Sequence, residues 1–559
     1  MIHFNRRYCA IALACFFCQI ALSQACLPDG TAATLAGNNV KSTLTNVGYL
    51  WDGNYQVPRA VLPQLVAPSA LYAGALMVAG KNAAGTLKIA AQVSDGSGRG
   101  GTDFFQGPLD SVGNVTPTTC ANFGKIFGVT ALEINTLRST NGFNLADNVR
   151  GWPAKGNPFF SAIHGFTLPN QDLAPFVDLN RDGIYNPSQG DYPDICGTHA
   201  YWWVFNDKGN THSASKGIPL GIEVRGMAYC YSSPTDSVLD NSTIYNYEII
   251  YKGTETLDSS FVGLWVDPDL GCNEDDYFGS SPANNMAFAY NADALDGAAP
   301  SGNCDDPFKK GYQRNIPLIG IKFLQTPKGT DGLELGMTNF MYHFTQSGTY
   351  AAKAGWAKSP TELYHYMSGR WRDGSPLTSG GDGTSTTNTA TKYAYPIAPN
   401  NTTGWNMPNS SANVLEKAMI MSCGPFRMTT GSRHRLSFAV VPDLNATGHP
   451  RPDITTLINN ANRLRNVCSF PTSVQNVLDK NIEVKVIPNP ASDEASFICP
   501  DVINRISIYN LAGQLIFDKK SVNTDAFKLS TQTIQSGIYT YKISDITGKT
   551  ALGRFAIMH

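Results

Sequence analysis

The sequence predicts a mainly β protein, with a multi-domain body of β-sandwiches that contains few helices and a separate small β domain at the C-terminus. Two observations support this prediction. The chain contains 52 Gly, 33 Pro, 8 Trp, 24 Tyr and 27 Phe, and aromatic side chains favour pleated strands while Gly and Pro favour the turns between them. Hydrophobic residues make up 42% of the chain and charged residues only 15%, so buried cores can form.

The length of the chain indicates how many domains it has, and its net charge indicates which partners it lacks. At about 150 residues per domain, a chain of 559 residues predicts several domains. We expect β-rich regions at 26–170, 171–300 and 301–468, a linker at 469–481 and the terminal domain at 482–559. A formal net charge of −2 gives no broad field for phosphate backbones or anionic lipid. Nucleic acid and membrane surfaces are therefore not expected as partners.

Residues 1–25 have the pattern of a secretory signal peptide. Two arginines precede an apolar run at 9–22, and Ser23-Gln24-Ala25 offers small residues to a signal peptidase. The run is shorter than the roughly 20 residues that a membrane-spanning helix needs. No later stretch replaces it, so we expect no transmembrane segment in the mature chain. Lipidation of Cys26 is the alternative at this cleavage point.

The elements of the body follow from local patterns. Apolar segments at 70–78 and 86–93 flank a turn at 81–85 and predict a hairpin. Thr130 and Glu133 have capping-box spacing, which predicts a short helix from Thr130. Further strands are predicted at 201–205, 222–230, 243–251, 261–266, 286–290, 318–324, 418–422 and 436–441.

Two later segments differ from these strands. Gly, Ser and Thr dominate residues 373–391, which predicts an exposed loop. Between 453 and 468, apolar residues recur at helical spacing behind Asp453, which predicts an amphipathic helix with Asp453 as its cap. In the strand at 243–251, the period of two places three tyrosines and Ile249 on one face.

Nine cysteines follow the predicted cleavage point, widely spaced and without a Cys-x-x-Cys motif. This pattern indicates structural thiols or disulfides in an oxidising compartment. Because the number is odd, at least one thiol must stay unpaired within the chain. Cys272 with Cys304, and Cys423 with Cys468, are the first pairs to test, on their proximity in the sequence alone.

The strongest chemical motif is an acidic loop at 178–191. Oxygen-bearing side chains stand at alternate positions before Gly183, as at the start of a calcium loop. Gln189 cannot give the bidentate carboxylate of an EF-hand, so a later aspartate is expected to complete a different kind of loop. The predicted calcium ligands are Asp178, Asn180, Asp182, Ile184 and Asp191. The alternative is a metal-free turn.

A second acidic group follows the predicted strand at 261–266. Its carboxylates form a second candidate cation site, or a pair for general acid and base work at a sugar. Solvated turn residues are the third interpretation. The group contains Asp267, Asp269, Glu274, Asp275 and Asp276, and its four aspartates are the predicted ligands of the second cation.

Trp202 and Trp203 are candidates for stacking against sugar rings. Adjacent residues of a strand point to opposite faces, so we expect one ring to be buried and the other to be accessible. Core packing is the alternative. The sequence contains no Gly-x-Ser-x-Gly elbow, no phosphate loop and no His-Glu-x-x-His motif, so it assigns no catalytic residue.

The last eighty residues carry the most specific pattern. Short strands are predicted at 484–487, 495–498, 505–509, 515–517, 527–529, 537–543 and 550–557. With Pro488-Asn489-Pro490 and the glycines Gly513, Gly537 and Gly553, they resemble the C-terminal (type A) sorting domain of proteins exported by the type IX secretion system of Bacteroidetes. The resemblance implies a seven-stranded Ig-like β-sandwich with these glycines at turns. It also implies recognition by the translocon and sorting machinery, and removal of the tail on attachment to surface lipopolysaccharide or on release.

The body resembles a family of large exported Bacteroidetes proteins without assigned activity, on motifs such as 103–110, 202–207 and 369–374. We therefore expect a secreted or cell-surface protein that reaches its location through the periplasm. Its expected role is non-enzymatic: binding, adhesion or envelope structure, stabilised by calcium, with a glycan or protein ligand. The alternative is an extracellular hydrolase of polysaccharide or protein that acts through carboxylates near 267–276.

Overall fold

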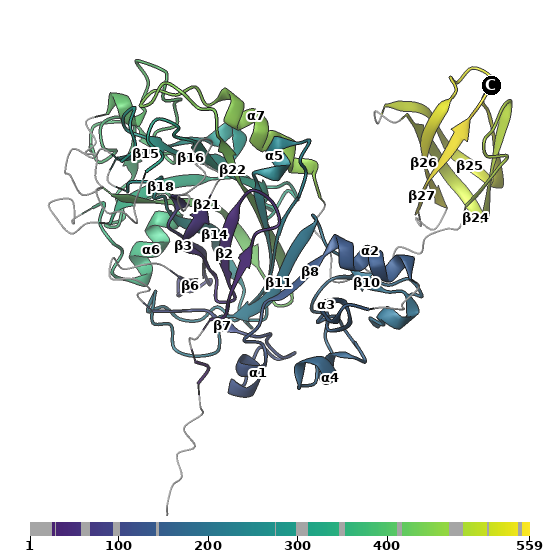
Figure 1. Ribbon diagram of the computed structural model, residues 1–559, viewed down its shortest axis with the longest axis horizontal. Helices are drawn as coiled ribbons and strands as arrows, with labels where there is room; N and C mark the ends of the chain where they lie inside the picture. Colours follow the sequence, from purple (N-terminus) through teal and green to yellow (C-terminus); the bar gives the residue numbers. More distant parts are fainter. Residues whose placement is uncertain are drawn as a thin grey trace, which may run out of the picture. The chain divides into compact units, whose positions relative to one another are not determined.

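The computed structural model describes residues 25–27, 30–56, 68–92, 101–140, 145–273, 275–297, 311–345, 353–410, 416–468, 484–510, 514–545 and 550–559. The chain divides into two compact units between Pro471 and Thr472, which we call the body and the tail (Figure 1). The predicted linker, and the predicted signal peptide apart from Ala25, lie outside the described residues. No helix in the described ranges is long and apolar enough to cross a membrane.

Two antiparallel sheets of nine strands each form the centre of the body. The first sheet has the order β1-β2-β3-β5-β14-β21-β18, with β4 beside β3 and β6 beside β5. Its strands are β1 (Ala32–Leu35), β2 (Lys41–Thr45), β3 (Tyr49–Gln56), β4 (Ser69–Leu71), β5 (Ala73–Lys81), β6 (Leu87–Ala91), β14 (Leu257–Asp267), β18 (Asn339–Phe344) and β21 (Lys417–Met428).

The second sheet has the order β15-β16-β17-β22-β13-β12-β11-β7, with β8 beside β11. Its strands are β7 (Phe105–Gln106), β8 (Phe127–Thr130), β11 (His199–Asn206), β12 (Ile222–Cys230), β13 (Thr243–Tyr251), β15 (Asp276–Ser281), β16 (Met286–Asn291), β17 (Leu318–Gln325) and β22 (Arg433–Asp443). Two small ribbons pair β9 (Phe176–Val177) with β10 (Tyr192–Pro193) and β19 (Leu377–Thr378) with β20 (Ala390–Thr391).

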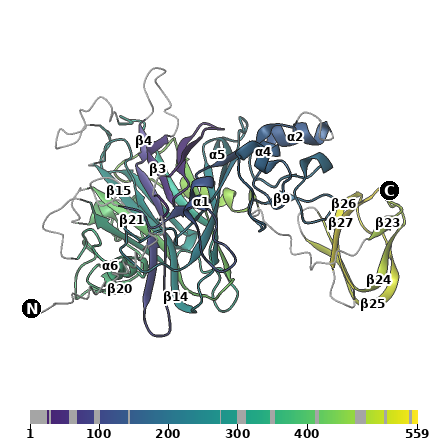
Figure 2. The ribbon, with the colours of Figure 1, turned by 90° about the horizontal axis from the view of Figure 1, so that it is seen from below.

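Short helices cover these sheets. The α-helices of the described residues are α1 (Pro117–Asn122), α2 (Ala131–Ser139), α3 (Asp147–Arg150), α4 (Phe160–His164), α5 (Ser237–Asp240), α6 (Pro360–Met367) and α7 (Thr455–Arg463). Single 3₁₀ turns lie at Pro187–Gln189, Pro282–Asn284, Met407–Asn409 and Leu464–Asn466. Figure 2 shows α2 and α4 at one side of the body and α6 at another.

Alternation along the strands builds two cores. Tyr245, Tyr247 and Ile249 of β13 lie in a large core that includes side chains of both sheets, which confirms their predicted common face. Ile244 of the same strand points the other way, into a second core that α2, α3, α4 and α7 help to form. Because both faces of the second sheet are covered, β12 and β13 are buried along their whole lengths.

Several predicted elements are confirmed. β5 and β6 form the expected hairpin, and β12 and β13 have the predicted bounds. Thr130 and Glu133 form the expected capping box of α2, with the Thr130 amide donating to Glu133 Oε2 at 2.8 Å. The predicted amphipathic helix is α7, but the prediction of Asp453 as its cap is wrong: the N-cap is Ile454, and Asp453 accepts from the amide of Thr455.

The boundaries expected at 170 and 300 do not separate compact units. Each nine-stranded sheet takes strands from all three predicted regions, as when β5, β14 and β21 lie side by side. Sequence reading divides a chain by local breaks, whereas antiparallel strands pair across long separations. The mainly β class with few helices is nevertheless confirmed.

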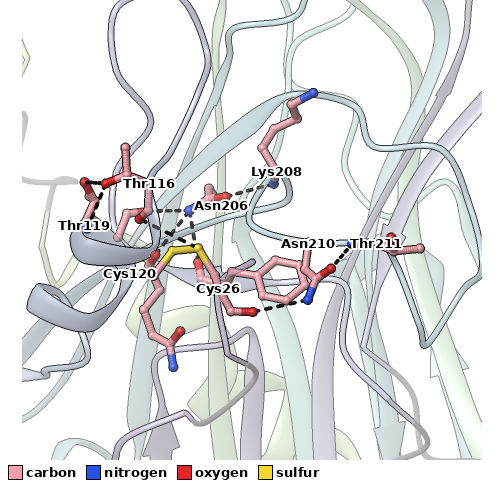
Figure 3. The surroundings of a disulfide bond; sticks show 11 residues. Cys26, Thr116, Thr119, Cys120, Asn206, Lys208, Asn210 and Thr211 are labelled. Atoms are coloured by element: carbon pink, nitrogen blue, oxygen red, sulfur yellow. Dashed lines mark hydrogen bonds between the residues drawn. A yellow bond between two sulfur atoms is a disulfide. The ribbon is translucent and has the colours of Figure 1, made fainter. Parts of the chain in front are cut away.

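Disulfides tie distant segments of the body together. Cys26 pairs with Cys120 of α1, and Figure 3 shows Asn210 beside Cys26, to whose carbonyl oxygen it donates. This sulfur therefore cannot also carry a lipid. Cys468 pairs with Cys196, so the predicted Cys423–Cys468 pair is wrong, and Cys423 is a buried thiol. Cys272 is in a disulfide, and its predicted partner Cys304 lies outside the described residues.

The tail is a single sheet of five strands with the order β23-β24-β26-β27 and β25 beside β24. The strands are β23 (Lys485–Ile487), β24 (Glu494–Tyr509), β25 (Leu515–Ser530), β26 (Gly537–Asp545) and β27 (Thr550–Ile557). The predicted count of seven is wrong because two pairs of predicted strands are each one long strand. Register shifts near Ile503 interrupt the pairing of β24 with β25. The sequence pattern is interrupted at the same place, so it predicts two short strands for each long one.

Candidate functional site

The predicted sorting residues close the tail sheet. Asn489 Oδ1 accepts from the amide of Ala556 in β27 at 2.8 Å. The neighbouring Ala491 donates to the Ala556 carbonyl and accepts from the Met558 amide, both at 2.8 Å. The Pro488-Asn489-Pro490 segment therefore fixes the last strand of the chain.

The predicted turn positions of the tail glycines are corrected. Gly537 begins β26 and Gly553 lies within β27. Gly553 is paired with Tyr541, and a Cβ at Gly553 would lie 2.2 Å from the Tyr541 hydroxyl. Its role is thus to make room for a neighbouring ring. Gly513 lies outside the described residues.

In the loop at 178–191, the polar side chains of the predicted calcium ligands accept hydrogen bonds from backbone amides of the same loop. Asp178 accepts from the amides of Arg181 and Gly183 at 2.7 and 2.8 Å. Asp182 accepts from the Ile184 amide, and the Asn180 side chain donates to Asp182. Asp191 is fully buried, and its pKa is raised by burial and by the charges of Asp178 and Asp182. The loop thus concentrates negative charge around one buried carboxyl.

Both tryptophans of β11 are buried, which contradicts the predicted sugar platform. Trp203 is 0% exposed in the core between the sheets, and Trp202 is 2% exposed in the second core. The rings do point to opposite faces, as predicted. The second ring is not accessible because helices cover the outer face of this sheet, which the sequence of β11 alone does not reveal.

The second acidic group lies where several strands of the body end, and we call this place the acidic end. Asp267 is the last residue of β14, and Glu416 directly precedes β21. These strands are antiparallel neighbours, so the end of one lies beside the start of the other. We define the acidic end by Asp267, Asp269, Asp275, Asp276, Asn291 and Glu416.

Three carboxylates of the acidic end converge. Asp267, Asp269 and Glu416 each place an oxygen within 4.8 Å of the other two. Among the described Asp, Glu, His and Cys residues, no other set of three has this metal-binding arrangement. Sequence reasoning found the two aspartates but missed Glu416, which is remote in the chain and adjacent only through strand pairing.

Burial makes this arrangement costly without a counter-charge. Asp267 is 5% exposed, and its Oδ1 has no hydrogen-bond donor. Burial, followed by the charges of Asp269 and Glu416, raises the pKa of Asp267 well above its usual value. The buried ammonium of Lys417 lies near Asp276, and burial lowers the pKa of this lysine to about 7.

Asp275 and Asp276 lie at the start of β15, apart from the converging trio. Asp276 Oδ2 accepts from the Leu270 amide at 2.9 Å, and charge interactions connect Asp276 with both Asp275 and Asp269. Burial, then the charges of Asp296 and Asp293, raises the pKa of Asp275 to about 7. Oxygen atoms in such a setting suit a hard cation such as calcium.

Comparison with known proteins identifies the tail. Residues 485–557 match the family model of the secretion system C-terminal sorting domain, from the first residue of β23 to the last of β27. The chain matches no curated protein.

Similar solved structures have low similarity throughout. A DUF3244 family protein from Bacteroides vulgatus with an immunoglobulin-like β-sandwich fold is 17% identical over 14% of this chain and 96% of its own, with a TM-score of 0.12. A polysaccharide lyase is 8% identical over 69% of this chain and 39% of its own, with a TM-score of 0.19. PorZ of Porphyromonas gingivalis, a surface component of the type IX secretion system, is 11% identical over 68% of this chain and 47% of its own, with a TM-score of 0.13. The alignments span less than half of the lyase and of PorZ, and scores this low support no inference about the body.

Proposed function

We propose that the body of this chain is a non-enzymatic binding or structural module that is stabilised by calcium. The sorting domain makes the chain a cargo of the type IX secretion system, delivered to the cell surface or released. The observation that supports this proposal is the convergence of Asp267, Asp269 and Glu416 at the acidic end. The sorting machinery of the secretion system is the partner of the tail. A glycan or protein ligand of the body, and attachment to surface lipopolysaccharide, belong to the same proposal.

Charge balance favours a bound cation at these three carboxylates. Removing a carboxylate from water costs free energy unless a counter-charge or hydrogen bonds compensate. Asp267 is buried with one oxygen lacking a donor, and Asp269 and Glu416 add like charges beside it. Calcium takes six to eight oxygen ligands, carboxylates among them, so one ion could bind all three carboxylates and offset two of their three charges.

The proposal also includes a calcium site outside the acidic end, in the loop at 178–191. Its ligands would be Asp178, Asn180, Asp182, the Ile184 carbonyl and Asp191. The raised pKa of buried Asp191 beside two further aspartates supports this assignment. Bound calcium would favour the ionised form of Asp191.

A hydrolase is the rival function, and the raised pKa values of Asp267 and Asp275 favour it, because a general acid must hold its proton near neutral pH. Burial argues against a polymeric substrate, since Asp267 is only 5% exposed. A panel of glycan and peptide substrates tests this rival. Turnover that disappears in Asp267→Asn would establish the hydrolase and refute the non-enzymatic proposal.

The calcium proposal predicts opposite effects of one substitution with and without the ion. In calcium-free buffer, at a pH where Asp267 is ionised, Asp267→Asn removes a buried like charge, so its Tm should exceed that of the wild type. Added calcium at 100 times its Kd should stabilise the wild type by about 2.7 kcal/mol per site, and Asp267→Asn should lose this increment at the acidic end. Differential scanning calorimetry of the mature chain measures both effects.

Asp258→Asn is the matched control. Asp258 lies near the start of β14, on the same strand as Asp267, and is half-exposed in an ion pair with Arg427 at 3.1 Å. It should keep the full calcium response. A wild type that does not respond to calcium, or an unchanged response in Asp267→Asn, would contradict a calcium ion at Asp267.

A further inference from the structure

A second set of buried oxygen atoms at the acidic end has no donors. The Oδ1 atoms of Asp275, Asp276 and Asn291 are all buried and lack a hydrogen-bond partner. The three residues are 2%, 8% and 0% exposed, respectively. Nearly all buried polar atoms in proteins have partners. A local excess of three acceptors therefore indicates a missing positive or donating group.

Strand pairing brings these residues together. Asp276 begins β15, Asn291 ends β16, and the two are direct partners in the antiparallel register. The Ala292 amide donates to the Asp275 carbonyl at 2.7 Å, which extends the pairing by one residue. The Asn291 amide group lies 3.5 Å from Asp275 Oδ2 and 3.2 Å from Asp293 Oδ1.

The surrounding charge is mainly negative, with the buried Lys417 near Asp276 as a cationic neighbour. Asp293 and Asp296 both act on Asp275, and Asp296 also acts on Asp276. Asp296 is fully buried and accepts from the amides of Cys272 and Tyr312. A proton would neutralise a single carboxyl, whereas a divalent cation can bind several oxygen atoms at once.

We propose that the acidic end binds two divalent cations, and that Asp275, Asp276 and Asn291 bind the second of them. This inference rests on the proposed function, which places the first cation at Asp267, Asp269 and Glu416. Asp276 connects the two positions, because its Oδ2 accepts from the amide of Leu270, which follows Asp269, and it pairs in register with Asn291. Carboxylate and amide oxygens are ligands that calcium accepts and softer metals disfavour.

Isothermal titration calorimetry with calcium chloride on the calcium-stripped mature chain tests the second position. Asn291→Leu removes an oxygen ligand at similar size and without changing charge, so it should lower the number of bound calcium ions by one. Asp275→Asn should do the same, and it remains informative if Asn291→Leu does not fold. Because Asp275→Asn also lowers the negative charge at the acidic end, this variant should have a higher Tm than the wild type in calcium-free buffer.

The outcomes separate the two proposals. If Asp275→Asn and Asn291→Leu both bind as many ions as the wild type while Asp267→Asn binds one fewer, the second cation is refuted and the first stands. If Asp267→Asn also keeps the wild-type number, both cations of the acidic end are refuted. Asp258→Asn should keep the wild-type number and serves as the control for a general charge effect.

Discussion

At the scale of single residues, His343 gives the body a defined sensitivity to acid. The ring is buried beside Trp265 and Trp356, and its Nε2 accepts from the Trp265 indole at 2.8 Å. Nδ1 faces the Phe344 carbonyl at 3.2 Å. An indole can only donate, so Nδ1 carries the single proton of a neutral ring. Burial accordingly lowers the pKa of His343 to about 4 from its usual 6.5.

The sign of the effect follows from this lowered pKa. The unfolded chain takes up the proton below about pH 6.5, while the folded body resists it down to about pH 4. The stability contributed by the neutral ring is therefore present above pH 6.5 and is lost as the pH falls from 6.5 to 4, by about 3 kcal/mol at 1.36 kcal/mol per unit.

His343→Gln should have a shallower decrease in the free energy of unfolding across this pH range. Urea denaturation at several pH values measures the slope. His434, whose pKa burial also lowers to about 4, should maintain part of the slope in the variant. An unchanged slope in His343→Gln would contradict the assignment.

The candidate site shows what single residues reveal in a sequence. Asp267 and Asp269 are recognisable because they are close together in the chain and follow an apolar strand. Glu416 and Asn291 have no such signal, since only the pairing of β21 with β14 and of β16 with β15 brings them near. The burial of Trp202 likewise depends on helices elsewhere in the chain.

At the scale of elements, local patterns predicted what depends on local physics. The capping box at Thr130 and the strands β12 and β13 are confirmed because periodicity and capping are properties of neighbouring residues. The number of strands in the tail was wrong because the interrupted pairing of β24 with β25 is a property of the sheet. Strand order was not predictable from any single element.

Two glycines of the tail provide a matched test of packing between elements. A Cβ at Gly553 would lie 2.2 Å from the Tyr541 hydroxyl, whereas the nearest heavy atom to a Cβ at Gly537 would be 3.7 Å away. Gly553→Ala should therefore destabilise the tail by about 1–3 kcal/mol, because Tyr541 must leave its position. Gly537→Ala should be tolerated. Hydrogen exchange of β26 and β27 in the full chain reports the difference, and equal exchange in both variants would contradict it.

At the scale of the whole molecule, the sorting domain and the candidate cation sites belong to different compact units of the chain. The tail has its own core, which includes Phe497 and Phe555, and it contains the sorting signal. Deleting 482–559 should leave the body folded and held in the periplasm. Fractionation and surface protease accessibility measure its location, and normal surface delivery of the truncated chain would contradict the role of the tail.

The disulfide between Cys196 and Cys468 determines what a cut between the body and the tail would leave behind after export. Cys468 is the last described residue of the body, and the bond joins it to a residue 272 positions earlier in the chain. A cut beyond Cys468 would thus create a new chain end that is already covalently anchored. If the tail is removed in this way, the disulfide keeps the segment that follows α7 attached to the body. An exopeptidase that trims this end inward would meet a covalent stop at Cys468.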